Sequence, residues 1–190
     1  MDIKIKKLIR DYQYNLETLD DIMEISVVAE SGFRTALNEE DPEAVRALSP
    51  DGNKKPEKAE KEKPPIIENG SKFKKLFRKA AVKCHPDKLT SDLSERDIIF
   101  MKACYENLTQ ANDTNDWGLL LIVSMELDIE FSDLGDDEVD NINNRIEELK
   151  KSISQYENSM AYSWYNNNDE EQKKSYLAEC AKIFRKSMGI

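Results

Sequence analysis

Residues 71–88 read SKFKKLFRKAAVKCHPDK, and position 85 holds the only histidine in the chain. Apolar side chains recur in this stretch every three or four residues, which is the spacing of one face of an α-helix. They are Phe73, Leu76, Phe77, Ala80, Ala81 and Cys84. Pro86 lacks a backbone N–H and disfavours the helical conformation at His85, so the helix must end there. The pattern predicts a helix over 71–84 that displays the imidazole of His85 and the carboxylate of Asp87 on a rigid turn.

The same stretch concentrates positive charge on an acidic chain. Residues 71–88 hold seven Lys or Arg and one Asp, a formal charge of +6, whereas the whole chain carries −10. A basic stripe on an acidic protein attracts an acidic partner. We expect no nucleic-acid partner, because most of the surface would repel phosphates and the stripe has no exposed stacking aromatics. From charge alone, a merely solvated helix face is the competing interpretation.

A second amphipathic helix is predicted after the turn. Ser94 is a favoured N-cap residue, and Asp97 stands three residues later in capping-box position. Its apolar positions follow the helical spacing and are Ile98, Met101, Cys104 (or Ala103), Tyr105, Leu108 and Ala111. We therefore expect two antiparallel helices that enclose the loop from Lys88 to Leu93.

This arrangement resembles the J-domain of DnaJ-type co-chaperones. In that family a basic helix precedes a His-Pro-Asp loop and lies against a helix that ends in an AYxxL pattern, here Cys104-Tyr105-Glu106-Asn107-Leu108. Cys84 stands where the family usually has tyrosine, and Phe77 matches an aromatic core position. The resemblance covers about residues 68–130, a third of the chain. With the tail SWYNNNDEEQKK, the chain looks like class C, uncharacterised bacterial and phage J-domain proteins with a helical C-terminal extension.

The resemblance implies a co-chaperone and not an enzyme. Such a domain binds a DnaK-type heat-shock chaperone and stimulates its ATP hydrolysis, so that the chaperone clamps a client, which this sequence does not identify. The implied contact residues are His85, Pro86 and Asp87 of the loop and the cations Lys74, Lys75, Arg78, Lys79, Lys83 and Lys88. No cofactor, metal or catalytic residue is implied. A lone histidine without a Gly-rich phosphate loop also leaves no complete active site.

One departure from the family supports an alternative function. J-domains begin with a short helix bearing a Y-x-x-L-G pattern, but Pro64-Pro65 and Asn69-Gly70 break any such helix here. Either the domain lacks its first helix, or another segment covers the apolar flank of the hairpin, for which the predicted helix from Trp117 to about Glu130 is the local candidate. The missing helix also favours a helical adaptor as the alternative function. Such an adaptor would be a scaffold whose J-like module binds a partner without stimulating ATP hydrolysis.

Long amphipathic helices are predicted on both sides of this module, so the expected fold is all-α. Two runs of residues follow a 3.5-residue period, which is typical of a seam for helix packing. The first, in which eight of ten positions are apolar, is Ile5, Ile9, Tyr12, Leu16, Leu19, Met23, Ser26, Glu30, Phe33 and Leu37. The second is Val139, Ile142, Ile146, Leu149, Ile153, Tyr156 and Met160. A bundle within one chain and a coiled coil in a homodimer both fit these seams. We expect one helix from about Glu138 to Tyr165, a break at 166–169, and a last helix.

Four segments follow from this pattern. They are an N-terminal helix at 1–48, a Pro-, Lys- and Glu-rich linker at 49–70, the J-like domain at 71–130 and a C-terminal helical hairpin at 131–190. We expect 1–48 and about 138–188 to pack together, separate from the J-like domain.

Cysteine usage and hydropathy favour a cytoplasmic protein. The three cysteines form no C-x-x-C pair, and two fall on apolar helix faces, which favours buried thiols in a reducing compartment. The most apolar run, 119–125, is far too short to span a membrane, and the N-terminus lacks a signal-peptide pattern.

Overall fold

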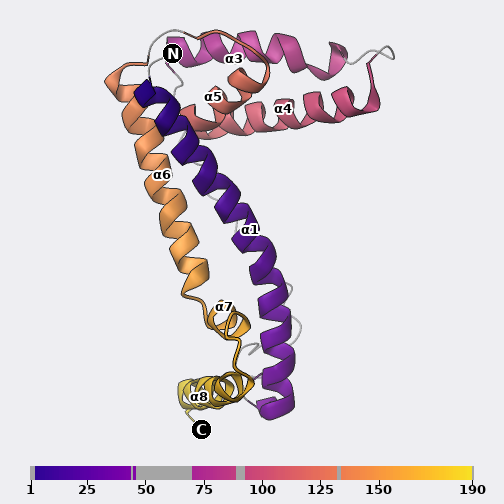
Figure 1. Cartoon of the computed structure of the whole chain (residues 1–190), viewed down its shortest axis with the longest axis vertical. Helices are drawn as coiled ribbons and strands as arrows, with labels where there is room; N and C mark the ends of the chain where they lie inside the picture. The colour runs from indigo at the N-terminus through magenta and orange to yellow at the C-terminus, as the bar shows by residue number, and fades with distance from the viewer. Residues whose placement is uncertain (1–2, 44, 46–69, 89–92, 132–133, 190) are drawn as a thin grey trace. The chain divides into compact units, whose positions relative to one another are not determined.

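The computed structural model describes residues 3–43, 45, 70–88, 93–131 and 134–189, and their regular structure is helical throughout (Figure 1). This confirms the all-α prediction. The elements are α1 (Ile3–Glu40), α3 (Ser71–Cys84), the 3-10 turn η1 (Pro86–Lys88), α4 (Glu95–Thr114), α5 (Trp117–Glu126), α6 (Asp136–Glu157), α7 (Met160–Tyr165) and α8 (Glu170–Met188). No described helix has both the length and the apolar character that a membrane crossing demands. The predicted linker, apart from Gly70, lies outside the described residues.

The chain divides into two compact units that share two helices. The first unit falls within Met1–Leu16 and Lys61–Glu148, and the second within Glu17–Glu60 and Leu149–Ile190. Both α1 and α6 therefore contribute residues to each unit. This differs from the predicted arrangement, in which the J-like domain was separate from the flanking helices. The first turns of α1 and the first half of α6 belong with the J-like helices.

The first unit is built on the predicted hairpin and on α5, which covers it. α3 and α4 lie side by side, and α5 packs against both (Figure 1). The sequence of α5, WGLLLIVSME, is apolar on almost every side, and Leu120, Leu121 and Val123 are completely buried. At its start the Trp117 ring meets the Phe73 ring of α3 edge to face, with centroids 5.2 Å apart. α5 thus supplies the cover that the hairpin needs in water.

Side-chain caps fix where α4 and α5 begin. The Ser94 hydroxyl accepts a hydrogen bond from the Asp97 backbone N–H at 3.1 Å, which confirms the predicted N-cap. Asp116 caps α5 by accepting from the Leu119 N–H, also at 3.1 Å. α5 ends at Glu126, earlier than predicted, and Asp128 just beyond it adopts a positive φ of 50°. A residue in this left-handed conformation cannot continue a right-handed helix.

A buried polar contact ties α1 to α5 and α6 within the first unit. The Tyr12 hydroxyl donates to Asp116 Oδ2 at 2.8 Å, and Arg145 Nε of α6 donates to the same oxygen at 3.0 Å. The Tyr12 ring also lies directly on Gly118 of α5, where a Cβ would clash with it. This contact is the physical reason why the start of α1 joins the J-like helices.

The second unit has its own core, formed by α1, α7 and α8. Its buried members are Ala29, Phe33, Leu37, Ala161, Leu177, Cys180 and Ala181. The Trp164 ring packs edge to face on Phe33, with centroids 5.8 Å apart. Arg185 Nε donates to Asp41 Oδ2 at 2.6 Å, which joins α8 to the residue that follows α1.

Two details of the flanking helices were predicted wrongly. The helix expected over 138–165 is interrupted at Asn158 and Ser159, because Ser159 accepts from the Tyr162 N–H and starts α7 as an N-cap. In the seam of α1, Met23 and Glu30 are exposed, whereas Ile22 and Ala29 are buried. Leaving the Glu30 carboxylate in water avoids the cost of burying an unpaired charge.

Candidate partner-binding site

The His-Pro-Asp segment forms a short, rigid turn at the end of α3. His85 leaves the helix with extended backbone angles, φ −60° and ψ 133°, as the following proline requires. Pro86–Lys88 then make a single 3-10 turn, closed by the Lys88 N–H donating to the His85 carbonyl at 2.9 Å. The proline and this hydrogen bond together limit the conformations of the turn.

The His85 ring is held between the turn and α4. Its Nδ1 accepts from the Asp87 N–H at 3.3 Å and lies 3.4 Å from Asp87 Oδ2. The ring also meets the Tyr105 ring edge to face, with centroids 5.3 Å apart. When Nδ1 accepts the backbone N–H, the ring proton sits on Nε2, so that atom remains a donor for a partner.

The turn presents its polar groups to solvent. The Asp87 side chain is 88% exposed and the His85 side chain 42% exposed, while Pro86 and Lys88 are exposed as well. An exposed carboxylate and imidazole contribute little to the stability of the fold. Because the turn already holds them in one geometry, less conformational entropy is lost when a partner binds them. The turn therefore has the properties of a contact site.

Two buried cysteines form the apolar base beneath this turn. Burial raises the pKa of Cys84, and burial together with Glu126 raises the pKa of Cys104 to about 12. The Cys84 thiol also donates to the Ala80 carbonyl at 3.4 Å. Both thiols stay neutral near pH 7, so they pack the hairpin and do not act as nucleophiles. Cys84 thus occupies a fully buried position at the end of α3.

The predicted contact cations lie along α3 and the turn, but they are not equivalent. The side chains of five of them make no ion pair or hydrogen bond within the described part of the chain, namely those of Lys74, Lys75, Arg78, Lys79 and Lys88. Lys83 is different, because its ammonium donates to the Leu127 carbonyl at 2.6 Å and to the Asp128 carbonyl at 3.1 Å. Its charge caps the C-terminal end of α5, where carbonyl groups lack helical partners.

Sequence reasoning missed this role of Lys83, because its acceptors lie 44 and 45 residues away. It also missed Lys72, whose ammonium lies 3.3 Å from a Glu138 oxygen of α6. No local pattern in the sequence connects these pairs. The turn residues His85, Pro86, Asp87 and Lys88, by contrast, are brought together by the chain order itself.

Comparison with protein-family models, curated proteins and solved structures found no match to this chain. Among the described residues, no group of three or more histidine, cysteine, aspartate or glutamate side chains is placed to hold a metal ion. The case for a function therefore rests on the geometry of the turn and of the helix that carries it.

Proposed function

We propose that this protein is a co-chaperone that binds a DnaK-type heat-shock chaperone and stimulates its ATP hydrolysis. The single observation that carries the proposal is the exposed His85-Pro86-Asp87 turn, braced on Tyr105 at the end of a basic helix. The Asp87 carboxylate would pair with a cation of the chaperone, and His85 and Pro86 would contact it beside that pair. The client protein would be held by the chaperone.

The exposed cations give this turn a means of attracting its partner. Lys74, Lys75, Arg78 and Lys79 lie within two helical turns of one another on α3, and Lys88 follows in the turn. Clustered exposed charges mainly accelerate encounter with an oppositely charged surface, and salt screens the effect. Lys83 is assigned a weaker part in recognition, because two carbonyl groups of α5 already hold its ammonium.

A second candidate function is a helical adaptor that binds a chaperone without stimulating it. The observation that favours it is the cover of the hairpin, which in the described part of the chain comes from α5, an element that follows the hairpin in the sequence. If another element packs on the hairpin, different parts of its surface remain accessible to a partner beside the turn. Both candidates place the partner on the same turn and differ in its effect on ATP hydrolysis.

Single-turnover ATP hydrolysis by a DnaK-type chaperone tests the proposal. We expect the wild-type protein to accelerate hydrolysis and His85→Gln and Asp87→Asn to abolish the acceleration, with helicity and melting temperature nearly unchanged. A matched control is Asp113→Asn, which alters an exposed carboxylate near the far end of α4 and should leave stimulation intact. Full stimulation by both turn variants would refute the co-chaperone function. Wild-type binding without stimulation would establish the adaptor.

A further inference from the structure

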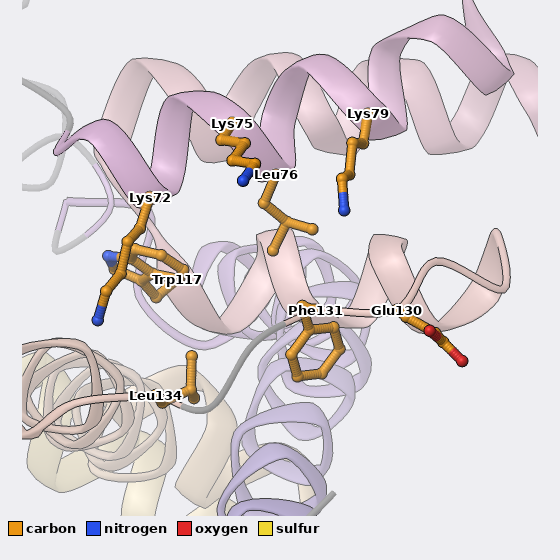
Figure 2. Close-up of a pocket in the computed structure, with 8 residues that line it drawn as sticks. All are labelled: Lys72, Lys75, Leu76, Lys79, Trp117, Glu130, Phe131 and Leu134. Carbon is orange, nitrogen blue, oxygen red and sulfur yellow. The ribbon is translucent and has the colours of Figure 1, made fainter.

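A pocket of about 170 Å³ opens beside α3 (Figure 2), and no residue of the His-Pro-Asp turn lines it. Its apolar walls come from Leu76, Trp117, Phe131 and Leu134. Figure 2 shows Leu76 pointing from α3 into the space, with Phe131 and Leu134 on the opposite side. A cavity of about 150 Å³ holds a benzene molecule, so this one has room for a single leucine or phenylalanine side chain.

Lysines surround the opening of this pocket. Lys72, Lys75 and Lys79 extend from α3 over it, and Glu130 contributes the one carboxylate of the lining (Figure 2). Lys72 is paired with Glu138, but Lys75 and Lys79 have no ionic partner within the described ranges. An occupant that carries negative charge beside its apolar group would complement these two cations.

The pocket continues into a shallower groove along α3. Lys79 and Glu130 line both, and the groove adds Arg78, Val82, Lys83, Asp128 and Ile129. Val82 is 58% exposed, so an apolar strip bordered by cations runs on beyond the pocket. A small anion would fill neither the length nor the apolar floor, whereas an extended peptide would occupy both.

We propose that this pocket and groove bind an acidic peptide segment of a partner protein, which inserts one leucine or phenylalanine between α3 and Phe131. Acidic side chains on either side of that residue would meet Lys75 and Lys79. Lys75 lies ten residues before His85, which corresponds to about 15 Å along α3. No residue of 85–88 lines the pocket or the groove, so peptide binding is tested apart from the turn, while Lys75 and Lys79 also belong to the cations proposed to attract the chaperone.

Binding of a synthetic peptide to the full-length chain tests the proposal. The probe is a fluorescein-labelled pentapeptide with leucine between two pairs of aspartates, and the matched control peptide has alanine in place of leucine. We expect saturable binding that is about 10- to 50-fold weaker for the alanine peptide, because three buried carbons are lost. In NMR spectra the Trp117 indole N–H signal should shift on binding, whereas that of Trp164 in the second unit should not.

Protein variants then locate the binding surface. Lys75→Glu with Lys79→Glu should weaken the leucine peptide at least 10-fold. Lys74→Glu with Lys88→Glu makes the same change in net charge at residues that line neither cavity, and should weaken it far less. Phe131→Ala, on the opposite wall, should weaken the leucine peptide while leaving any residual binding of the alanine peptide unchanged. His85→Gln should bind the leucine peptide as the wild type does.

Four results would overturn the inference. Equal binding of the two peptides, or equal loss in the two charge-reversed variants, would mean nonspecific attraction to a basic helix. A Trp117 signal that does not shift at saturation would place the peptide elsewhere. A concentration-dependent mass that Lys75→Glu with Lys79→Glu abolishes would show that a second copy of the chain occupies the pocket.

Discussion

Asp116 holds together three helices of the first unit although it is a single buried carboxylate. It is only 4% exposed, and its two oxygens accept hydrogen bonds from the Tyr12 hydroxyl, the Arg145 guanidinium and the Leu119 N–H. A buried charge is tolerated when it is paired and fully hydrogen-bonded in this way. In return, burial and the Asp116 charge raise the pKa of the Tyr12 phenol far above its ordinary value of 10. Tyr12 therefore remains a donor throughout the neutral pH range.

Gly118 allows this network to form, and its replacement gives the first stability prediction. A Cβ at this position would lie 2.7 Å from Tyr12 Cγ and closer still to two other atoms of the ring. Gly118→Ala must therefore displace Tyr12 or α5, and we expect a loss of about 1–3 kcal/mol in the free energy of unfolding. Urea denaturation followed by circular dichroism measures it.

Gly70→Ala is the control for that measurement. No atom lies within 4 Å of a Cβ built at Gly70, so this variant should stay within about 0.5 kcal/mol of the wild type. If Gly118→Ala were as stable as Gly70→Ala, the contact between the Tyr12 ring and α5 would not contribute to folding.

At the scale of elements, α3 has one face buried in the apolar core and another that is charged. A lysine of the charged face also stabilises the end of α5. Its buried residues Phe73, Leu76, Ala80 and Cys84 face α4 and α5, while Lys83 reaches the carbonyl groups at the end of α5. A cation at a helix C-terminus counters the partial negative charge there. Among the basic residues of α3, Lys83 thus contributes to folding as well as to the charge of the helix.

Replacing Lys83, with Lys74 as the comparison, distinguishes the effect of the Lys83 hydrogen bonds on stability from the effect of removing one positive charge. We expect Lys83→Met to lower the free energy of unfolding by about 0.5–1.5 kcal/mol, because two carbonyl groups lose a charged donor. Lys74→Met removes the same charge from an exposed position of the same helix and should change stability by less than about 0.5 kcal/mol. Thermal unfolding of both variants in the same buffer makes the comparison. Equal melting temperatures would mean that the Lys83 contact adds nothing.

Local patterns predicted the elements that local chemistry determines. The end of α3 follows from Pro86, the start of α4 from Ser94 and the start of α5 from Asp116, each within four residues in the sequence. The prediction failed at Ser159, where a side-chain cap starts a new helix inside an otherwise periodic run. It also failed where a contact spans the chain. Tyr12 and Asp116 are 104 residues apart, and no repeating pattern in the sequence predicts their hydrogen bond.

At the scale of the whole molecule, the single helix α1 supplies buried residues to both units. Tyr12 of α1 is buried in the first unit, and Phe33 of the same helix belongs to the core of the second. An uninterrupted helix propagates order along its hydrogen bonds, since each added residue costs less than starting a new turn. The two units should therefore support each other through α1.

This reasoning predicts that both units unfold in one transition. The chain has two tryptophans, Trp117 in the first unit and Trp164 in the second, so 5-fluorotryptophan labelling gives one ¹⁹F signal for each unit. We expect the two signals to report the same urea midpoint in the wild type. Asp20→Pro removes a hydrogen bond in the middle of α1 and should cost about 3 kcal/mol in helix stability. The two midpoints should then separate, whereas Asp20→Ala at the same exposed position should leave them coincident. Separate midpoints in the wild type would show that α1 does not couple the units, and each core would then fold on its own.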